Sequence, residues 1–202
     1  MTRRLVQLYA GLVLYGASMA LMIRAGLGLD PWDVLHQGLA ERLPLSFGMV
    51  TIVVGALVLL AWIPLRQRPG FGTVSNVIVI GLAVDAALVV LPAPDALAFR
   101  VVFMLAGVGL NGVATAAYIG ARLGPGPRDG LMTGLVRRTG RSVRLVRTSI
   151  EVTVLAAGWV LGGTVGVGTV VYALGIGPLV HVLLPALTVP EPTRAELSLA
   201  HA

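Results

Sequence analysis

Residues 28–33 read Gly-Leu-Asp-Pro-Trp-Asp, and residues 124–129 read Gly-Pro-Gly-Pro-Arg-Asp. The two stretches carry Gly, Pro and Asp at the same spacing. Glycine adopts backbone angles that are closed to other residues, and proline fits the first turn of a helix, where its missing N–H is not needed. An acid two residues further on is stabilised by the positive end of the helix. Each stretch therefore predicts a turn followed by the start of a helix.

The signature belongs to a longer repeat, because a shift of 96 positions aligns many more identical residues without a gap. The matches include Gly, Pro and Asp in order, which chance similarity between apolar segments would not produce. The matched pairs outside the signature include Gly11 with Gly107, Gly16 with Gly112, Gly38 with Gly134, Gly70 with Gly166, Gly72 with Gly168, Thr73 with Thr169, and Gly81 with Gly177. The sequence is therefore a duplication.

The composition is that of a membrane protein. Hydrophobic residues occupy 56% of the 202 positions and charged residues only 12%. In water such a chain would expose far more apolar surface than the roughly 300–600 Å² patches that soluble monomers tolerate. We therefore expect the lipid bilayer to be its solvent. Cysteine is absent, which excludes disulfides and thiolate metal sites, and we expect no metal or other cofactor.

Six stretches approach the about 20 apolar residues that a membrane-spanning helix needs. They are residues 5–23, 47–65, 73–92, 101–121, 145–165 and 169–189. Two further segments, residues 31–42 and 127–139, are too short and too polar to cross. The predicted fold is an all-α polytopic membrane protein of about six transmembrane helices, arranged as two inverted three-helix repeats, each with a short interrupted or re-entrant helix.

Three spans per half place the second half in the opposite orientation to the first. Residues 1–98 form the first repeat, residues 99–189 the second, and residues 190–202 a cytoplasmic tail. Arginine tests the orientation, because basic residues concentrate on the cytoplasmic side. With both termini cytoplasmic, only Arg24, Arg42 and Arg100 lie outside. The arginines on the cytoplasmic side are then Arg3, Arg4, Arg66, Arg68, Arg122, Arg128, Arg137, Arg138, Arg141, Arg144, Arg147 and Arg194.

The acids of the two signatures allow two interpretations. Asp33 and Asp129 can be first-turn acids that only stabilise their helices. Alternatively, two half-helices aim their N-termini at a ligand near the middle of the membrane, as in transporters built from inverted repeats. The candidate substrate or ion-binding residues here are Asp30, Asp33, His36, Gln37, Arg128 and Asp129. Asp33, His36 and Gln37 share one helix face.

Three more candidates lie inside predicted spans, where an ionisable residue costs about 2.5–3.5 kcal/mol on insertion scales. Asp85 aligns with His181 at the 96-residue offset. We expect these two to meet near the symmetry axis, where they can exchange a proton, unless each is purely structural. Glu151 follows Arg147 by four residues and is expected to be neutralised by it.

The sequence carries none of the motifs of common enzymes, such as Gly-x-Ser-x-Gly, His-Glu-x-x-His, a phosphate-binding P-loop or a dinucleotide fingerprint. We therefore expect no catalytic residues, although Asp33 and Asp129 leave a small place for an intramembrane aspartyl hydrolase. The basic stretch at residues 137–147 fits the positive-inside rule, and no nucleic-acid module accompanies it, so no nucleic-acid partner is expected.

Residues 28–38, with Gly-Leu-Asp-Pro-Trp-Asp-Val-Leu-His-Gln-Gly, resemble the YczE-like branch of the bacterial YczE/YyaS/YitT integral membrane proteins. Residues 62–70, 124–130 and 162–169 add to the resemblance, which extends to about position 185. It implies a multi-pass protein of the bacterial plasma membrane and brings neither a substrate nor catalytic residues with it.

The repeat architecture favours a small secondary transporter or export permease that moves an unidentified small molecule or ion. The alternative is a membrane scaffold or regulatory protein that transports nothing and acts through partner helices. A polar cavity in the structure would favour the transporter, and its absence would favour the scaffold. The sequence leaves homo-oligomer formation open.

Overall fold

The computed structural model describes residues 1–190, which form eight α-helices and no strand. Residues 191–202 of the predicted cytoplasmic tail lie outside the described part. The helices are α1 (Thr2–Ala25), α2 (Pro31–Ala40), α3 (Phe47–Trp62), α4 (Phe71–Val90), α5 (Leu97–Gly120), α6 (Pro127–Thr139), α7 (Val143–Val160) and α8 (Val167–Leu187). The all-helical fold class predicted from the sequence is confirmed.

The helix starts follow the 96-residue offset. The pairs α2 and α6, α3 and α7, and α4 and α8 each begin at matching positions in the two halves. Both short helices begin at the prolines of the signature, Pro31 and Pro127, and hold Asp33 and Asp129 in their first turns. The signature therefore predicted both helix starts correctly.

Four helices, α1, α4, α5 and α8, are long and apolar enough to cross a membrane. The helix α3 is apolar but has only 16 residues. The helix α7 has 18 residues and carries Arg144, Arg147 and Glu151. Length and composition thus identify four spans among residues 1–190, and α3 and α7 fall short of this criterion.

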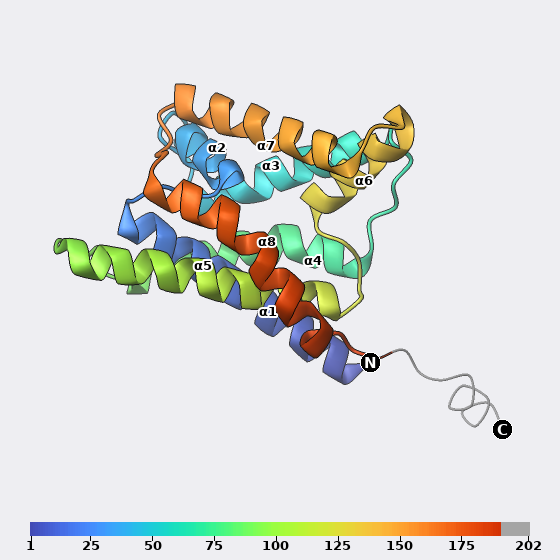
Figure 1. The fold of residues 1–202 in the computed structure, drawn as a ribbon, viewed down its shortest axis with the longest axis horizontal. Helices are drawn as coiled ribbons and strands as arrows, with labels where there is room; N and C mark the ends of the chain where they lie inside the picture. The colour runs from blue at the N-terminus through green and yellow to red at the C-terminus, as the bar shows by residue number, and fades with distance from the viewer. Residues whose placement is uncertain (191–202) are drawn as a thin grey trace.

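The eight helices form two groups (Figure 1). The four long apolar helices pack in the order α4, α1, α5 and α8, while α2, α3, α6 and α7 pack as a ring against that row. Each half of the chain contributes two helices to each group. The central pair runs antiparallel, because Gly11 near the start of α1 contacts Tyr118 near the end of α5, whereas Gly107 contacts Met22 near the end of α1.

Small residues allow the row to pack closely. A Cβ at Gly16 would lie 2.6–2.8 Å from atoms of Ile80, Ala83 and Val84 in α4, and one at Gly107 would lie 2.6 Å from the Met22 side chain. Such contacts are typical of membrane helices, whose association depends on van der Waals packing. Close packing therefore accounts for these glycines.

Two backbone contacts, here called the clasps, join the halves. The amide of Gly168 donates to the carbonyl of Leu27 over 2.7 Å, and the amide of Gly72 donates to the carbonyl of Leu123 over 2.8 Å. Each clasp ties the loop before a short helix to the first turn of a long helix from the other half. Gly28, which follows Leu27, has a φ of 111°, and a Cβ there would lie 2.6 Å from the Gly166 amide nitrogen, so only glycine fits.

The halves differ in how the third helix meets the fourth. In the first half α3 packs directly on α4, with Gly55 against Val77. In the second half α7 packs on α2 and α6 and makes no comparable contact with α8 (Figure 1). Glu151 occupies the position that corresponds to Gly55. A long acidic side chain at this position does not permit the close approach that glycine allows.

Asp85 does not meet His181, so the predicted acid–base pair is wrong. The Asp85 carboxylate instead accepts hydrogen bonds from the Ser46 hydroxyl and from the Gly48 amide over 2.7 Å, and thereby caps the start of α3. His181 is exposed on α8. The physical reason is the asymmetry just described, because α7 stands away from α8 and offers His181 no helix end to bind.

We expect Asp85→Ala to lower the free energy of unfolding by about 1–3 kcal/mol, because two hydrogen bonds that join α3 to α4 are lost. The matched control is His181→Ala, at the corresponding exposed position, which should change stability little. The midpoint of thermal unfolding in detergent measures both. Equal midpoints for the two variants would contradict the capping role.

Candidate functional site

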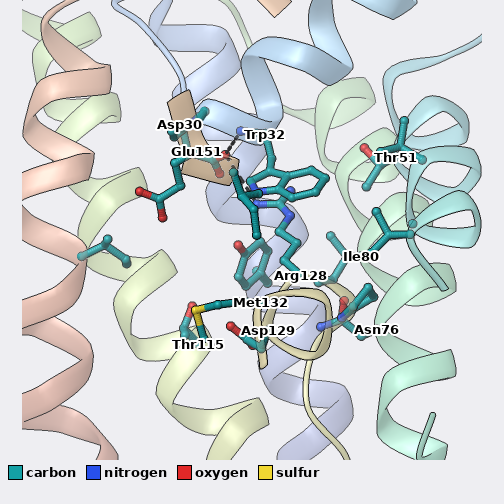
Figure 2. A pocket seen from close by; sticks show the side chains of 18 of the residues that line it. Asp30, Trp32, Thr51, Asn76, Ile80, Thr115, Arg128, Asp129, Met132 and Glu151 are labelled. Carbon is teal, nitrogen blue, oxygen red and sulfur yellow. Dashed lines mark hydrogen bonds and ion pairs between the residues drawn. The ribbon is translucent and has the colours of Figure 1, made fainter. Parts of the chain in front are cut away.

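A cavity of about 280 Å³ lies between the two groups of helices and is lined by residues from all eight. Figure 2 shows Arg128 within it beside Trp32, with Glu151 on one side and Thr51 and Asn76 on the other. The volume is just below the about 300–1,000 Å³ of typical small-molecule sites. We expected a polar cavity to favour the transporter over the scaffold. Polar and charged side chains of both halves meet at this cavity.

The N-termini of α2 and α6 both reach this cavity, but the two helix starts are capped differently. The Asp30 carboxylate caps α2 by accepting hydrogen bonds from the amides of Trp32, over 2.8 Å, and Asp33, over 3.0 Å. The corresponding residue of the second half is Gly126, which has no side chain to cap α6. Only one of the two helix starts therefore brings its own capping carboxylate.

Arg128 links the two helix starts. Its guanidinium nitrogens lie 3.5 Å from Oδ1 of Asp30 and 3.6 Å from Oδ1 of Asp33, and its Cζ lies 4.9 Å from the centre of the Trp32 ring. Both carboxylates are almost fully buried, whereas 29% of the Arg128 side chain stays exposed to the cavity. Trp32 and Arg128 are repeat equivalents, so one half supplies the cation and the other the ring that it covers.

His36 extends the cluster toward α3. Its Nδ1 lies 3.1 Å from Oδ1 of Asp33 and 3.4 Å from the hydroxyl of Thr51. A neutral imidazole that donates from Nδ1 to the carboxylate satisfies this geometry. Its ring also packs edge-on against Phe47, with 5.9 Å between ring centres. His36 is thereby held in one orientation at the cavity wall.

Asp129 is the acid of the site that has no ion-pair partner among residues 1–190. Its Oδ2 accepts a hydrogen bond from the Tyr118 hydroxyl over 3.1 Å. Within residues 1–190 no Arg or His nitrogen lies within ion-pair distance of this carboxylate. The repeat equivalent Asp33, by contrast, contacts both Arg128 and His36. Asp129 therefore lines the cavity without an ion-pair partner among the described residues.

Glu151 and Arg147 form the intrahelical ion pair that the sequence predicted, with 2.9 Å between Glu151 Oε1 and Arg147 Nε. Both residues also line the cavity, along the side formed by α7. The Glu151 side chain is 39% exposed. The pair is thus neutralised as expected and still belongs to the site.

Three predicted candidates lie away from the cavity. Asp85 caps α3 and His181 is exposed, as described above. Gln37 accepts a hydrogen bond from the Thr164 amide over 2.8 Å and so fastens α2 to the loop before α8. Gln37 lies one turn after Asp33, displaced around the helix in the opposite direction to His36, so its side chain reaches the loop and not the cavity.

The aromatic lining was not predicted from the sequence. Tyr15, Tyr118 and Tyr172, three of the four tyrosines, line the cavity. The hydroxyl of Tyr172 donates to Oδ1 of Asn111 over 3.0 Å, and Nδ2 of Asn111 donates to the Ser18 hydroxyl over 2.9 Å. A sequence signal existed, because the offset aligns Tyr15 with Asn111 and also Asn76 with Tyr172.

The site can bind a small charged or polar molecule. Its charged groups come from both halves of the chain, and its aromatic rings provide flat apolar walls. Within residues 1–190 no group of three or more His, Asp and Glu side chains is arranged to hold a metal ion. A ligand in the cavity would contact carboxylates, one cation that has two acidic partners, and hydroxyl donors.

The comparisons with known proteins agree with the membrane character of the helices. The profile of a family of unknown function, DUF6198, matches residues 2–185. An uncharacterized protein of Haemophilus influenzae is 42% identical over 86% of this chain and 79% of its own length. From Bacillus subtilis, the uncharacterized membrane protein YczE is 34% identical over 88% of this chain and 83% of its own length, and the uncharacterized protein YyaS is 25% identical over 87% and 89%. No solved structure matches the chain.

Proposed function

Because this chain belongs to the DUF6198 family, in its YczE-like branch of multi-pass membrane proteins, we propose that it is a small secondary transporter or export permease. The observation that carries the proposal is the cavity between the halves, where Arg128 of α6 reaches Asp30 and Asp33 of α2. Sites of inverted-repeat transporters lie where interrupted helices of the two repeats meet.

The proposed membrane arrangement has six spans, with α2 and α6 as half-helices inside the membrane. The antiparallel packing of α1 against α5 supports inverted halves. At about 1.5 Å per residue, α3 and α7 are about 24 Å and 27 Å long, close to the about 30 Å of the hydrocarbon core. The arginines of α7 then lie near its cytoplasmic end, where long side chains reach the interface.

Both termini are cytoplasmic in this proposal. Arg128 and Arg147 line the cavity and therefore do not report on the orientation. The remaining arginines still favour a cytoplasmic position for the end of α6, which carries Arg137 and Arg138, and for the α6–α7 connection, which carries Arg141.

The difference between the halves supports alternating access. In the present arrangement α3 contacts α4 directly, while α7 stands off from α8. Two inverted repeats that exchange these two arrangements would open the cavity to opposite sides in turn. The ion pairs of Arg128 with Asp30 and Asp33 join the halves at the centre of this movement and can stay intact while the outer helices rock.

The alternatives find less support. A scaffold has no need for a cavity that brings four acids and two arginines together. A hydrolase with two catalytic aspartates needs a shared proton between them. Asp33 instead contacts Arg128 and His36, and Asp129 contacts Tyr118.

Because the chain has no cysteine, single cysteines test the proposal without a known substrate. Met132→Cys and Thr115→Cys place a thiol in the cavity. We expect both to react with a membrane-impermeant thiol reagent applied from either side, in right-side-out and in inverted vesicles, because the cavity opens alternately. Labelling is read by a mass shift of the protein.

Three further cysteines calibrate the measurement. Asp95→Cys should react only from outside and Arg141→Cys only from the cytoplasm, which tests the orientation. Val182→Cys, 73% exposed on α8, should face lipid and stay unlabelled. Cavity cysteines that react from one side only, or from neither, would contradict alternating access and favour the scaffold.

A further inference from the structure

The charges in the cavity do not balance. Asp30, Asp129 and Glu151 line the cavity and Asp33 is buried beside Arg128, so four carboxyl groups share two arginines. Arg128 is shared by Asp30 and Asp33, and Arg147 by Glu151, so neither is left over for Asp129. Buried charges are normally paired, because desolvating a lone ion is expensive. The cavity is therefore short of positive charge.

The surroundings of Asp129 suit an organic cation. Tyr15, Trp32, Tyr118 and Tyr172 all line the cavity, and aromatic faces attract cations, most strongly when water is excluded. The cavity already shows this preference, because the Arg128 guanidinium lies 4.9 Å from the Trp32 ring centre. The Tyr118 hydroxyl orients Asp129 without neutralising it.

An anion finds fewer free partners. The start of α6 lacks a side-chain cap, and Arg128 is partly exposed. However, Arg128 lies within 3.6 Å of two buried carboxylates, which already offset its charge. A bound anion would add a fifth negative charge beside Asp30, Asp33 and Asp129, and like charges at such distances repel strongly in a poorly solvated site.

We infer that the cavity binds a small organic monocation, such as a protonated amine on an aromatic or aliphatic body, with its charge on Asp129 and its apolar part against the tyrosines. This inference deepens the proposed function, on which it rests for the idea that the ligand is a substrate. The cavity volume of about 280 Å³ restricts the ligand to a small molecule.

The test compares three probes of one shape and different charge, which are benzylammonium, benzyl alcohol and benzoate. Each is titrated into the purified full-length protein in detergent at pH 7, and binding is read from the rise of the unfolding midpoint with probe concentration. We expect benzylammonium to bind at least tenfold more tightly than benzyl alcohol, and benzoate not to bind.

Variants assign the binding to the site. Asp129→Asn keeps the hydrogen bond to Tyr118 and removes the charge, and it should weaken benzylammonium binding about tenfold or more. Glu151→Gln, at a position 39% exposed, should also weaken it and serves if Asp129→Asn does not fold. Asp95→Asn, on the exposed α4–α5 connection, should leave the affinity unchanged. Tighter binding of benzoate, binding of no probe, or full affinity in both cavity variants would overturn the inference.

The outcome can be separated from that of the transport proposal. If cavity cysteines react from one side only but benzylammonium binds through Asp129, the cation site exists without transport. If they react from both sides and benzylammonium gains nothing over benzoate, transport stands and the ligand class is wrong.

Discussion

Gly130→Val should abolish folded protein, and a second change, Trp62→Gly, should restore part of it. A Cβ on Gly130 would lie 1.9 Å from Cζ2 of Trp62, whose ring is buried and fixed by a hydrogen bond from Nε1 to the Pro127 carbonyl over 3.0 Å. The ring cannot turn away from α6 without losing this hydrogen bond. Overpacking of this severity exceeds the about 1–3 kcal/mol typical of added methylenes.

The internal duplication explains why Trp62→Gly should partly restore folding of the Gly130→Val variant. The offset aligns Trp62 with Gly158 and Gly130 with Val34. At the equivalent contact between α7 and α2, Gly158 packs against the backbone of Val34 and Leu35, so the glycine lies on the other helix of the pair. The double variant therefore copies the pair of residue types that the protein already uses at the equivalent contact. Trp62→Gly alone should cost about 3–5 kcal/mol, as large-to-small core changes do.

The yield of monodisperse protein in detergent and its unfolding midpoint measure the four species. Gly109→Val is the matched control, because a Cβ there meets nothing within 4 Å. It should be tolerated. If Gly130→Val is as stable as the parent, or if the double variant is no better than Gly130→Val, the interlocking of α3 and α6 is not as described.

Arg128→Met should destabilise the protein by about 3–5 kcal/mol, the cost of leaving a buried charge without its partner. Methionine keeps most of the volume and the contact with Trp32. Asp30 and Asp33, which are 2% and 1% exposed, then face each other without a cation. The folded protein should unfold at a markedly lower temperature or fail to accumulate in the membrane.

Adding Asp30→Asn and Asp33→Asn to Arg128→Met removes the unpaired charges and should restore most of the stability. Asparagine caps a helix about as well as aspartate, so α2 keeps its start. The triple variant should nevertheless lose the two-sided labelling of Met132→Cys, if the ion pairs hold the halves together during the movement. A stable single variant Arg128→Met would show that the ion pairs contribute little.

The fold could be predicted from the sequence where signals are local or repeated. Pro31 and Pro127 mark the starts of α2 and α6 because proline and a following acid act within one turn. The repeat then located the remaining helices in pairs. The helices α3 and α7 have 16 residues and three charged side chains respectively, which places them at the limit of what length and composition can decide.

The site was predictable only in part. Asp30, Asp33, His36, Arg128, Asp129 and Glu151 lie together at the cavity, and all were candidates because charge in an apolar chain is rare. The Asp85–His181 pair failed because it assumed two equal halves. The helix α3 packs on α4 whereas α7 does not pack on α8 to the same extent, and such a packing difference cannot be predicted from the sequence offset.

The aromatic residues escaped prediction for another reason. A tyrosine in an apolar helix, such as Tyr172, can face lipid, a neighbouring helix or a cavity. The sequence pattern does not distinguish these three environments. Only the exchange of Tyr15 for Asn111 across the halves indicated a shared polar network.

The clasps also set the order in which the chain can complete its fold during synthesis. When Leu123 is synthesised, its partner Gly72 is already part of the chain. Leu27, by contrast, is synthesised long before its partner Gly168 in the last helix. At about 5–20 residues per second this delay lasts about 7–30 s. During that time Asp30 and Asp33 are already part of the chain while Arg128 has yet to be made. Until then the first half is a nascent chain whose two acids lack their cationic partner.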